Sequence, residues 1–191
     1  MNVLNHAYLP AGFHFNLVEN LTILEPSWRN VSSEGDTEYD MKSKLRRGNY
    51  TDLNLYITSI AAGEGDQQIL GYASVHPQTR RMPPLLTLSR TFPERPSKRA
   101  FELDGVVIHP GTLPGGSLDK VNGGITLVHE VGHWLSLFHT FEAHGNDTNL
   151  GGCYGQGDYI FDTPAEASSA SGCPVVRNQI NGTPRESGPE S

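Results

Sequence analysis

Short apolar or alternating segments recur along the first 110 residues of this 191-residue chain. Because successive strand side chains point to opposite faces, such segments bounded by turn residues are typical of β-strands. The segments that predict strands are 13–19, 53–60, 68–77 and 104–110. Two further segments, 1–9 and 41–47, have patterns that predict short helices, and Pro10 begins the turn that ends the first. The order of these elements indicates a single α/β domain.

Residues 125–138 would be apolar almost all round if they were helical. This pattern predicts a central, buried helix that follows the glycine-containing turn at 110–124. The helix contains His129, Glu130 and His133. At about 100° per residue, the two histidines stand only about 40° apart and can hold one metal ion from one face. Without a metal, buried imidazoles would need hydrogen-bond partners and a buried carboxylate would need a partner of opposite charge. One zinc ion can serve as the partner of all three groups.

A third histidine decides what kind of site this is. In a continued helix, His139 would lie about 240° round from His133 and could not reach the same ion, so the helix is expected to end between them. In the motif H-E-x-x-H-x-x-G-x-x-H a glycine makes this turn, but this chain has Ser136 there. A left-handed serine costs roughly 1 to 2 kcal/mol, whereas a structural zinc site is worth on the order of 10 kcal/mol, so we predict a positive φ at Ser136. If Ser136 kept helical geometry instead, Glu142 and Asp158 would be the first candidates for the third ligand.

Three histidine ligands would give the zinc ion hydrolytic chemistry. Neutral imidazoles leave Zn²⁺ a fourth position for water, whose pKa then falls to about 7. Glu130 can take the proton of this water and pass it to a leaving amine, while zinc polarises the scissile carbonyl. The predicted function is a zinc-dependent endopeptidase that hydrolyses peptide bonds by Glu130-assisted attack of zinc-bound water, so its partner is a peptide or protein substrate. The alternative is a catalytically inactive zinc-binding remnant. The remaining histidines have no such neighbours and are interpreted as ordinary polar residues: His6, His14, His76, His109 and His144.

Three stretches in and around this segment resemble the pappalysin family of metzincin zinc metalloproteases, above all its secreted fungal members. They are LDGVVIHPGTLPGGS, GGITLVHEVGHWLSLFHTF and GDYIFDTPAEA, and the resemblance extends from the N-terminus to about Pro174. It implies a metzincin-like catalytic domain at 1–174, with an N-terminal subdomain at 1–136 and a partial, irregular C-terminal subdomain at 137–174. The α/β sheet should be twisted and mostly parallel with an antiparallel cleft-edge strand, beside a central zinc-binding helix. The tail at 175–191 is expected to be disordered.

The resemblance also implies roles for individual residues. His129, His133 and His139 would be the zinc ligands, and Glu130 would be the general base. The residues of the cleft-edge strand, which would pair with extended substrate, are Gly71, Tyr72 and Ala73. The residues of an implied calcium-binding segment are Asp158, Asp162 and Thr163. Two aspartates in a glycine-rich loop also fit a solvated turn, so calcium is one of two interpretations.

The ends and the cysteines depart from the family pattern. Family members carry a signal peptide and propeptide upstream and a Met-turn downstream, so the resemblance implies that both ends of this chain are truncated. The family also joins its counterparts of Cys153 and Cys173 to two later cysteines, and Ile180 stands about where the first of these should be. Those two bonds are therefore not expected. From the residues alone, the two cysteines fit either one disulfide or two thiols.

Charge and glycosylation sequons narrow the partners and the location. The formal net charge of -7 argues against nucleic acid or an anionic membrane surface as a partner. No run approaches the roughly 18 apolar residues needed to cross a bilayer, and the N-terminus lacks the layout of a signal peptide. Sequons of the form N-x-[ST] begin at Asn20, Asn30, Asn49, Asn146 and Asn181. Chance would give roughly two, so the excess favours a secreted, glycosylated protein, with a surface rich in Asn and Thr as the alternative. The sequence indicates no oligomeric state.

The segment 78–102 is basic and contains four prolines. It is predicted to be an irregular surface loop, because proline removes backbone donors and interrupts both helices and strands. A contact with an anionic substrate is the alternative interpretation.

Overall fold

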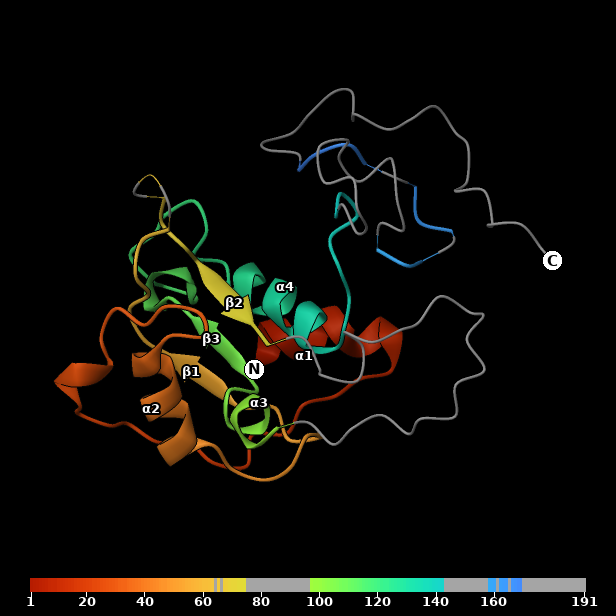
Figure 1. Cartoon of the computed structure of the whole chain (residues 1–191). Helices are drawn as coiled ribbons and strands as arrows, with labels where there is room; N and C mark the ends of the chain where they lie inside the picture. The colour runs from red at the N-terminus through yellow and green to blue at the C-terminus, as the bar shows by residue number, and fades with distance from the viewer. Residues whose placement is uncertain are drawn as a thin grey trace. The chain divides into compact units, whose positions relative to one another are not determined.

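The computed structural model in Figure 1 describes part of the chain, in two compact units. The described residues are 1–63, 65, 67–74, 97–142, 158–160, 162–164 and 166–169. One unit is Met1–Ser136 and the other is Leu137–Ser191. The first unit contains all the helices and strands named below, and the second contributes short turns around residues 137–142 and 158–169.

A three-stranded sheet forms the centre of the first unit. Its strands are β1 (Leu55–Ile57), β2 (Gly71–Ala73) and β3 (Val106–Ile108), in the order β1-β3-β2. β1 pairs with β3 in parallel, and β2 pairs with β3 in antiparallel orientation. The middle strand is apolar and buried at all three positions. Three of the segments predicted to be strands therefore contain strands, each shorter than its hydrophobic pattern.

The fourth predicted strand, at 13–19, is wrong. The structure describes this segment and assigns no strand to it. Its apolar side chains do not alternate between a core and solvent, since Phe13, Leu17 and Val18 are 46%, 63% and 95% exposed. Alternation indicates a strand only where a neighbouring strand receives the segment, and in the described part of the chain none does, although Phe15 packs against the core.

Helices cover the two faces of the sheet (Figure 1). On one face lie α1 (Asn2–Tyr8) and α4 (Ile125–Trp134), which pack against Val106 and Ile108. On the other lies α2 (Asp36–Leu45), whose Met41 packs with Tyr56 and Val107. The alternation of β3 side chains explains this division, because residues 106 and 108 point one way and residue 107 the other. Shorter elements connect these: η1 (Leu9–Ala11), η2 (Pro26–Trp28), α3 (Lys98–Glu102) and η4 (Pro110–Thr112).

Of the two short helices predicted from the sequence, the second needs correction at its boundaries. The first helix is confirmed, and the turn that follows it reaches Gly12 with φ 78°. The second, predicted at 41–47, begins earlier and spans Asp36–Leu45. Its first turn is polar, with Asp36 and Glu38 favourably placed for the helix dipole, so hydrophobic periodicity did not reveal it.

The segment 78–102 is not an irregular loop throughout. Residues 78–96 lie outside the described part of the chain, but Lys98–Glu102 form α3. The side chain of Ser97 caps this helix by accepting a hydrogen bond from the Ala100 N–H at 3.1 Å. Phe101 lies against the Arg46 guanidinium, with 3.9 Å between its ring centroid and Cζ. A cap and a buried contact thus define a short helix within a proline-rich segment.

The predicted central helix is confirmed in part. α4 occupies Ile125–Trp134 and ends four residues before the apolar pattern does. Its burial is incomplete: Glu130, Val131, Gly132 and Trp134 are buried, whereas Ile125 is 64% exposed and His129 is also exposed, so the expectation that both histidines are buried is wrong for His129. Among the described residues, no helix is both long enough and apolar enough to span a bilayer. The predictions for the tail at 175–191, for Cys153 and Cys173, and for His76 and His144 fall outside the described residues.

Candidate metal centre

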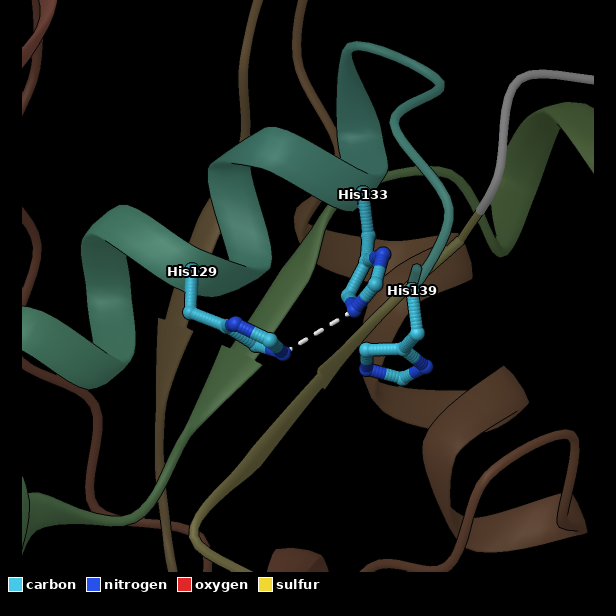
Figure 2. A group of neighbouring side chains, drawn as sticks. All are labelled: His129, His133 and His139. Carbon is cyan, nitrogen blue, oxygen red and sulfur yellow. Dashed lines mark hydrogen bonds between the residues drawn. The ribbon is translucent and has the colours of Figure 1, made fainter. Parts of the chain in front are cut away.

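The last two turns of α4 place two histidines side by side. The rings of His129 and His133 project from the same side of the helix (Figure 2), and their Nε2 atoms are 3.0 Å apart. The ring planes are nearly perpendicular, at 89°. Four residues separate the two histidines, which is close to one helical turn, so this proximity follows from the helix geometry.

The helix ends just after the second histidine, as the spacing of the third one requires. Ser136 has φ 76°, which confirms the predicted left-handed turn. The backbone N–H of Ser136 donates to the His133 carbonyl at 2.8 Å, and that of Leu135 donates to the Val131 carbonyl at 2.9 Å. These bonds satisfy the last carbonyls of the helix where the chain leaves its axis.

The turn at Ser136 is followed by the third histidine. His129, His133 and His139 each offer one ligand atom, and these atoms lie within 4.8 Å of one another. Figure 2 shows the three imidazoles gathered at the end of α4. Among the described residues, they form the only group of three or more His, Cys, Asp or Glu side chains placed to hold one ion.

Glu142 holds the third histidine by its other ring nitrogen. The distance from His139 Nδ1 to Glu142 Oε1 is 2.8 Å. Imidazoles that ligate a metal commonly donate their second N–H to a carboxylate, which fixes the ring orientation and leaves the opposite nitrogen for the ion. Sequence reasoning considered Glu142 only as a substitute ligand. Its spacing of three residues from His139 is the signal that could have indicated this orienting role.

The histidine group fits a tetrahedral zinc ion. At zinc–nitrogen distances of about 2.0 to 2.1 Å, ligand nitrogens in a tetrahedron lie roughly 3.3 Å apart. The Nε2 atoms of His129 and His133 approach to 3.0 Å, so an ion between them requires only a small outward shift. The donors are all imidazole nitrogens, which suit zinc better than the oxygen-preferring calcium or magnesium.

Glu130 lies on α4 between the two histidines and is buried. Only 7% of its surface is exposed, and no residue in the described ranges donates a hydrogen bond to its carboxylate. Burial raises the pKa of Glu130 from 4.5 to about 7. A carboxyl group with a pKa in this range can both accept and release a proton near neutral pH. A divalent cation nearby would lower this pKa by favouring the charged form.

β2 presents backbone groups at the far side of the sheet from β1. The Leu70 carbonyl accepts from the His109 N–H, and the Ser74 N–H donates to the Gly105 carbonyl. Because bonded pairs alternate along an antiparallel ladder, the N–H and C=O groups of Gly71 and Ala73 point away from β3. No strand in the described part of the chain pairs with that edge.

A buried carboxylate that sequence reasoning missed fastens the end of α4 to the sheet. Asp104, just before β3, is fully buried. Its Oδ1 accepts from the indole N–H of Trp134 and from the Ser74 hydroxyl, each at 3.1 Å. Its Oδ2 pairs with Arg46 Nη2 at 2.8 Å. Trp134 directly follows His133, so this network holds the backbone beside one of the histidines.

The predicted calcium segment lies in the second unit. Asp158 is 4% exposed, and its Oδ1 accepts a hydrogen bond from the Ile160 N–H at 3.1 Å. Asp162 and Thr163 lie at a turn and a bend, and the Thr163 N–H donates to the Ile160 carbonyl at 3.4 Å. Calcium binding stays a prediction.

Comparison with known proteins identifies the chain's relatives. The Peptidase_M43 family model, described as pregnancy-associated plasma protein-A, matches residues 113–182. An extracellular metalloprotease of Pyricularia oryzae is 40% identical over 184 residues, which is 96% of this chain and 53% of that protein. These matches show that the chain is similar to metalloproteases of the pappalysin family. Extracellular metalloprotease 1 of Coccidioides posadasii is 39% identical over 184 residues, covering 95% of this chain and 54% of its own length. An extracellular metalloprotease of Arthroderma benhamiae is 35% identical over 175 residues, covering 91% of this chain and 49% of its own length.

The resemblance to the pappalysin family that the motifs indicated is thus confirmed. The family match and the small mixed sheet flanked by helices agree with a metzincin-like α/β fold. The chain spans about half the length of the curated relatives it matches.

Proposed function

We propose that this chain contains the zinc-binding and base-bearing part of a metalloendopeptidase. The observation that carries the proposal is the gathering of His129, His133 and His139 at the end of α4, with the buried Glu130 on the same helix. The proposed subdomains are 1–136 and 137–174, of which the first corresponds to the sheet-containing unit. The names of the relatives, which are extracellular metalloproteases, support the same activity.

Each proposed residue has a defined task in peptide hydrolysis. The three histidines would hold zinc, which when bound lowers the pKa of a water molecule and polarises a carbonyl group. The Glu130 carboxylate accepts a proton from the attacking water and transfers it to the nitrogen of the leaving amine. Glu142 holds His139 by Nδ1 and thereby keeps its ring oriented.

The outward edge of β2 is the proposed place for the substrate backbone. An extended peptide that paired with Gly71 and Ala73 would use the backbone groups that point away from β3, adding a strand to the sheet. Tyr72, between them, would hold the strand in place, because its backbone groups face β3 and its side chain packs against the cluster that contains Met41 and Val107 on the opposite face. The partner is therefore a peptide or protein in extended conformation.

A secreted location and a second ion complete the proposal. The relatives are named as extracellular proteins, and the five sequons are consistent with glycosylation after secretion. Calcium is proposed for Asp158, Asp162 and Thr163, supported by the burial of the first carboxylate. Calorimetric titration with calcium would test it: no heat of binding, and no change when Asp158 is replaced by Asn, would exclude this ion.

Metal analysis of the purified chain tests the zinc site first. We expect close to one equivalent of zinc, reduced at least tenfold in His133→Ala because a two-ligand site binds far more weakly. His14→Ala is the matched control, since His14 is exposed and remote from the three histidines in sequence. Equal zinc content in all three proteins would contradict the proposed ligands.

Peptidase activity is tested separately with a fluorogenic peptide. A chelator should abolish cleavage, and Glu130→Gln should lower kcat by about 100-fold or more, the range expected for removal of a general base. Glu19→Gln serves as control because Glu19 is exposed. Zinc binding without any cleavage by the wild-type chain would instead favour the inactive zinc-binding alternative. Undiminished cleavage by Glu130→Gln would show that another group is the base.

A further inference from the structure

The contact between β2 and α4 depends on a position without a side chain. A methyl group at residue 71 would lie 3.0 Å from Glu130 Cγ, 2.9 Å from Ile108 Cδ1 and 3.1 Å from the Val107 carbonyl oxygen. Ordinary van der Waals separation between such atoms is about 3.5 to 4.0 Å. The stem of the Glu130 side chain therefore occupies the space that any other residue at position 71 would need.

Space, and not backbone conformation, is what requires glycine here. Gly71 belongs to a regular strand and is not among the glycines with positive φ. An alanine could therefore adopt its backbone conformation without strain, and its methyl group would be limited by the close approach of these three nearest atoms. The next residue on the same face of β2 is Ala73, which is also small and packs against the core beneath α4. Tyr72 is the large residue of the strand and packs on the opposite face.

The three neighbours differ in how easily they can move. The Val107 carbonyl belongs to the central strand, which is held on both sides by strand pairing. Ile108 Cδ1 is the end of an apolar side chain, and it can rotate or be deleted by a change to valine. Glu130 is attached to α4, whose backbone is fastened by the Tyr8 hydroxyl to the Val128 carbonyl at 2.9 Å. A side chain at position 71 would thus be accommodated by movement of the Ile108 and Glu130 side chains, and only Glu130 carries a proposed catalytic group.

We propose that Gly71 is a positioning residue for Glu130: its missing side chain defines where the glutamate stem lies between β2 and α4. This inference rests on the proposed function, because it concerns the group assigned there as general base. The same residue would then have two tasks, since its backbone also points toward the edge proposed for the substrate. Direct contact with substrate alone would not require glycine, because any residue supplies the same N–H and C=O groups.

Three variants separate the glutamate contact from simple packing. Gly71→Ala introduces all three close approaches, and Gly71→Ala with Ile108→Val removes the one to Ile108 Cδ1. Gly123→Ala is the matched control, because a methyl group there meets no atom within 4 Å and Gly123 has no positive φ. Glutamate labelled with ¹³C at the carboxyl carbon provides a signal for Glu130, assigned by its disappearance in Glu130→Gln. This signal reports the position of the group whether or not the protein cleaves peptides.

The expected result is a shifted Glu130 signal in both Gly71 variants and none in Gly123→Ala. Zinc content should stay near one equivalent, while kcat falls on the order of tenfold with little change in KM, because a displaced base impairs the chemical step. Recovery of the signal and of kcat in the double variant would overturn the proposal, since the constraint would then lie in packing on Ile108. An unshifted signal in Gly71→Ala, or a shifted signal with unchanged kcat, would also overturn it.

Failure of the proposed function is distinguishable from failure of this inference. If the wild-type chain binds zinc but cleaves nothing, the ¹³C carboxyl signal of Glu130 decides alone. A shift of this signal that persists in the double variant supports the positioning role of Gly71, and the absence of a shift refutes it. If Gly71→Ala does not fold, the double variant carries the test, because it lacks the closest of the three contacts.

Discussion

The two faces of the sheet bury carboxylates in opposite ways. On the side of α2, Glu38 receives Lys42 Nζ at 2.7 Å and the Glu34 backbone N–H at 2.6 Å. On the side of α4, Glu130 is buried to a similar degree but receives no hydrogen bond from the described residues. A buried charge normally has partners because an unpaired one is costly to desolvate. The paired carboxylate serves the scaffold, whereas the unpaired one stands beside the candidate metal centre.

Asp104 resembles Glu38 in having partners for its carboxylate, although it contacts α4. Its two oxygens are occupied by Arg46, Trp134 and Ser74. Hydrogen bonding therefore distinguishes Glu38 and Asp104 from Glu130, the proposed general base, whereas burial does not, because all three carboxylates are buried. Replacing each by its amide, at nearly constant shape, tests whether this distinction holds.

The largest effect is expected for Asp104→Asn. The amide cannot neutralise the buried Arg46 guanidinium, and its NH₂ group would face one of the donors that the carboxylate now accepts from. We expect the free energy of unfolding to fall by about 3 to 5 kcal/mol, the range for a broken buried ion pair. Urea unfolding monitored by tryptophan fluorescence measures it. A loss below about 1 kcal/mol would mean that the network contributes little to stability.

Glu130→Gln, in contrast, should raise the free energy of unfolding of the metal-free protein. Burial raises the pKa of Glu130 from 4.5 to about 7, so the folded state binds more protons than the unfolded state between these values. With respect to this group, the wild-type protein therefore has its full stability below pH 4.5, where Glu130 is protonated in both states, and it loses stability as the pH rises through 7. Glutamine cannot ionise, so the variant should equal wild type near pH 4.5 and exceed it by about 3 kcal/mol at pH 8.

Thermal unfolding in the presence of a chelator at the two pH values checks this prediction. Added zinc should reduce the difference at pH 8, because a cation near Glu130 stabilises its charged form. A gap between variant and wild type that is the same at pH 4.5 and pH 8 would contradict the assigned cause.

Glu38→Gln should destabilise the protein less than Asp104→Asn, by roughly 1 to 3 kcal/mol near pH 7. Burial already lowers the pKa of Lys42, so this amine can lose its proton when its partner is removed. In the variant, the folded state should release this proton at lower pH than the unfolded state does, so stability rises with pH up to about 10.5. Unfolding at pH 7 and pH 9 should therefore show a smaller deficit at the higher pH. An equal deficit would indicate that Lys42 stays charged.

The smallest effect concerns the turn that separates the two parts of the histidine motif. Ser136 has φ 76°, so Ser136→Gly should relieve strain and raise stability with zinc bound by about 1 kcal/mol or less, since glycine also frees the unfolded chain. Ser136→Ala is the control and should bring no gain, because alanine is strained at this φ. Differential scanning calorimetry measures both. A clear loss in the glycine variant would mean that the serine side chain stabilises the turn.

Local patterns predicted the elements that depend on nearest neighbours in sequence. The spacing of His129 and His133 along a helix, the break at Ser136 and the short strands around Tyr56 and Val107 follow from helix and strand periodicity. Prediction failed where the outcome depended on distant partners. Residues 13–19 alternate like a strand but lack one to pair with among the described residues. The helix α3 follows a proline-rich stretch, and its Phe101 packs against Arg46, which is distant in sequence.

The sequence by itself determined which groups the candidate site contains, because the three histidines, their spacing and the adjacent glutamate are all encoded within eleven residues, 129–139. Only the tertiary structure decided the environment of that glutamate. Glu130 is buried, receives no hydrogen bond from the described residues and lies close to Gly71 because α4 packs on β2. These two residues are almost sixty positions apart in the sequence. The physical reason is that desolvation and close approach depend on which surfaces meet in three dimensions, and no local pattern specifies that meeting.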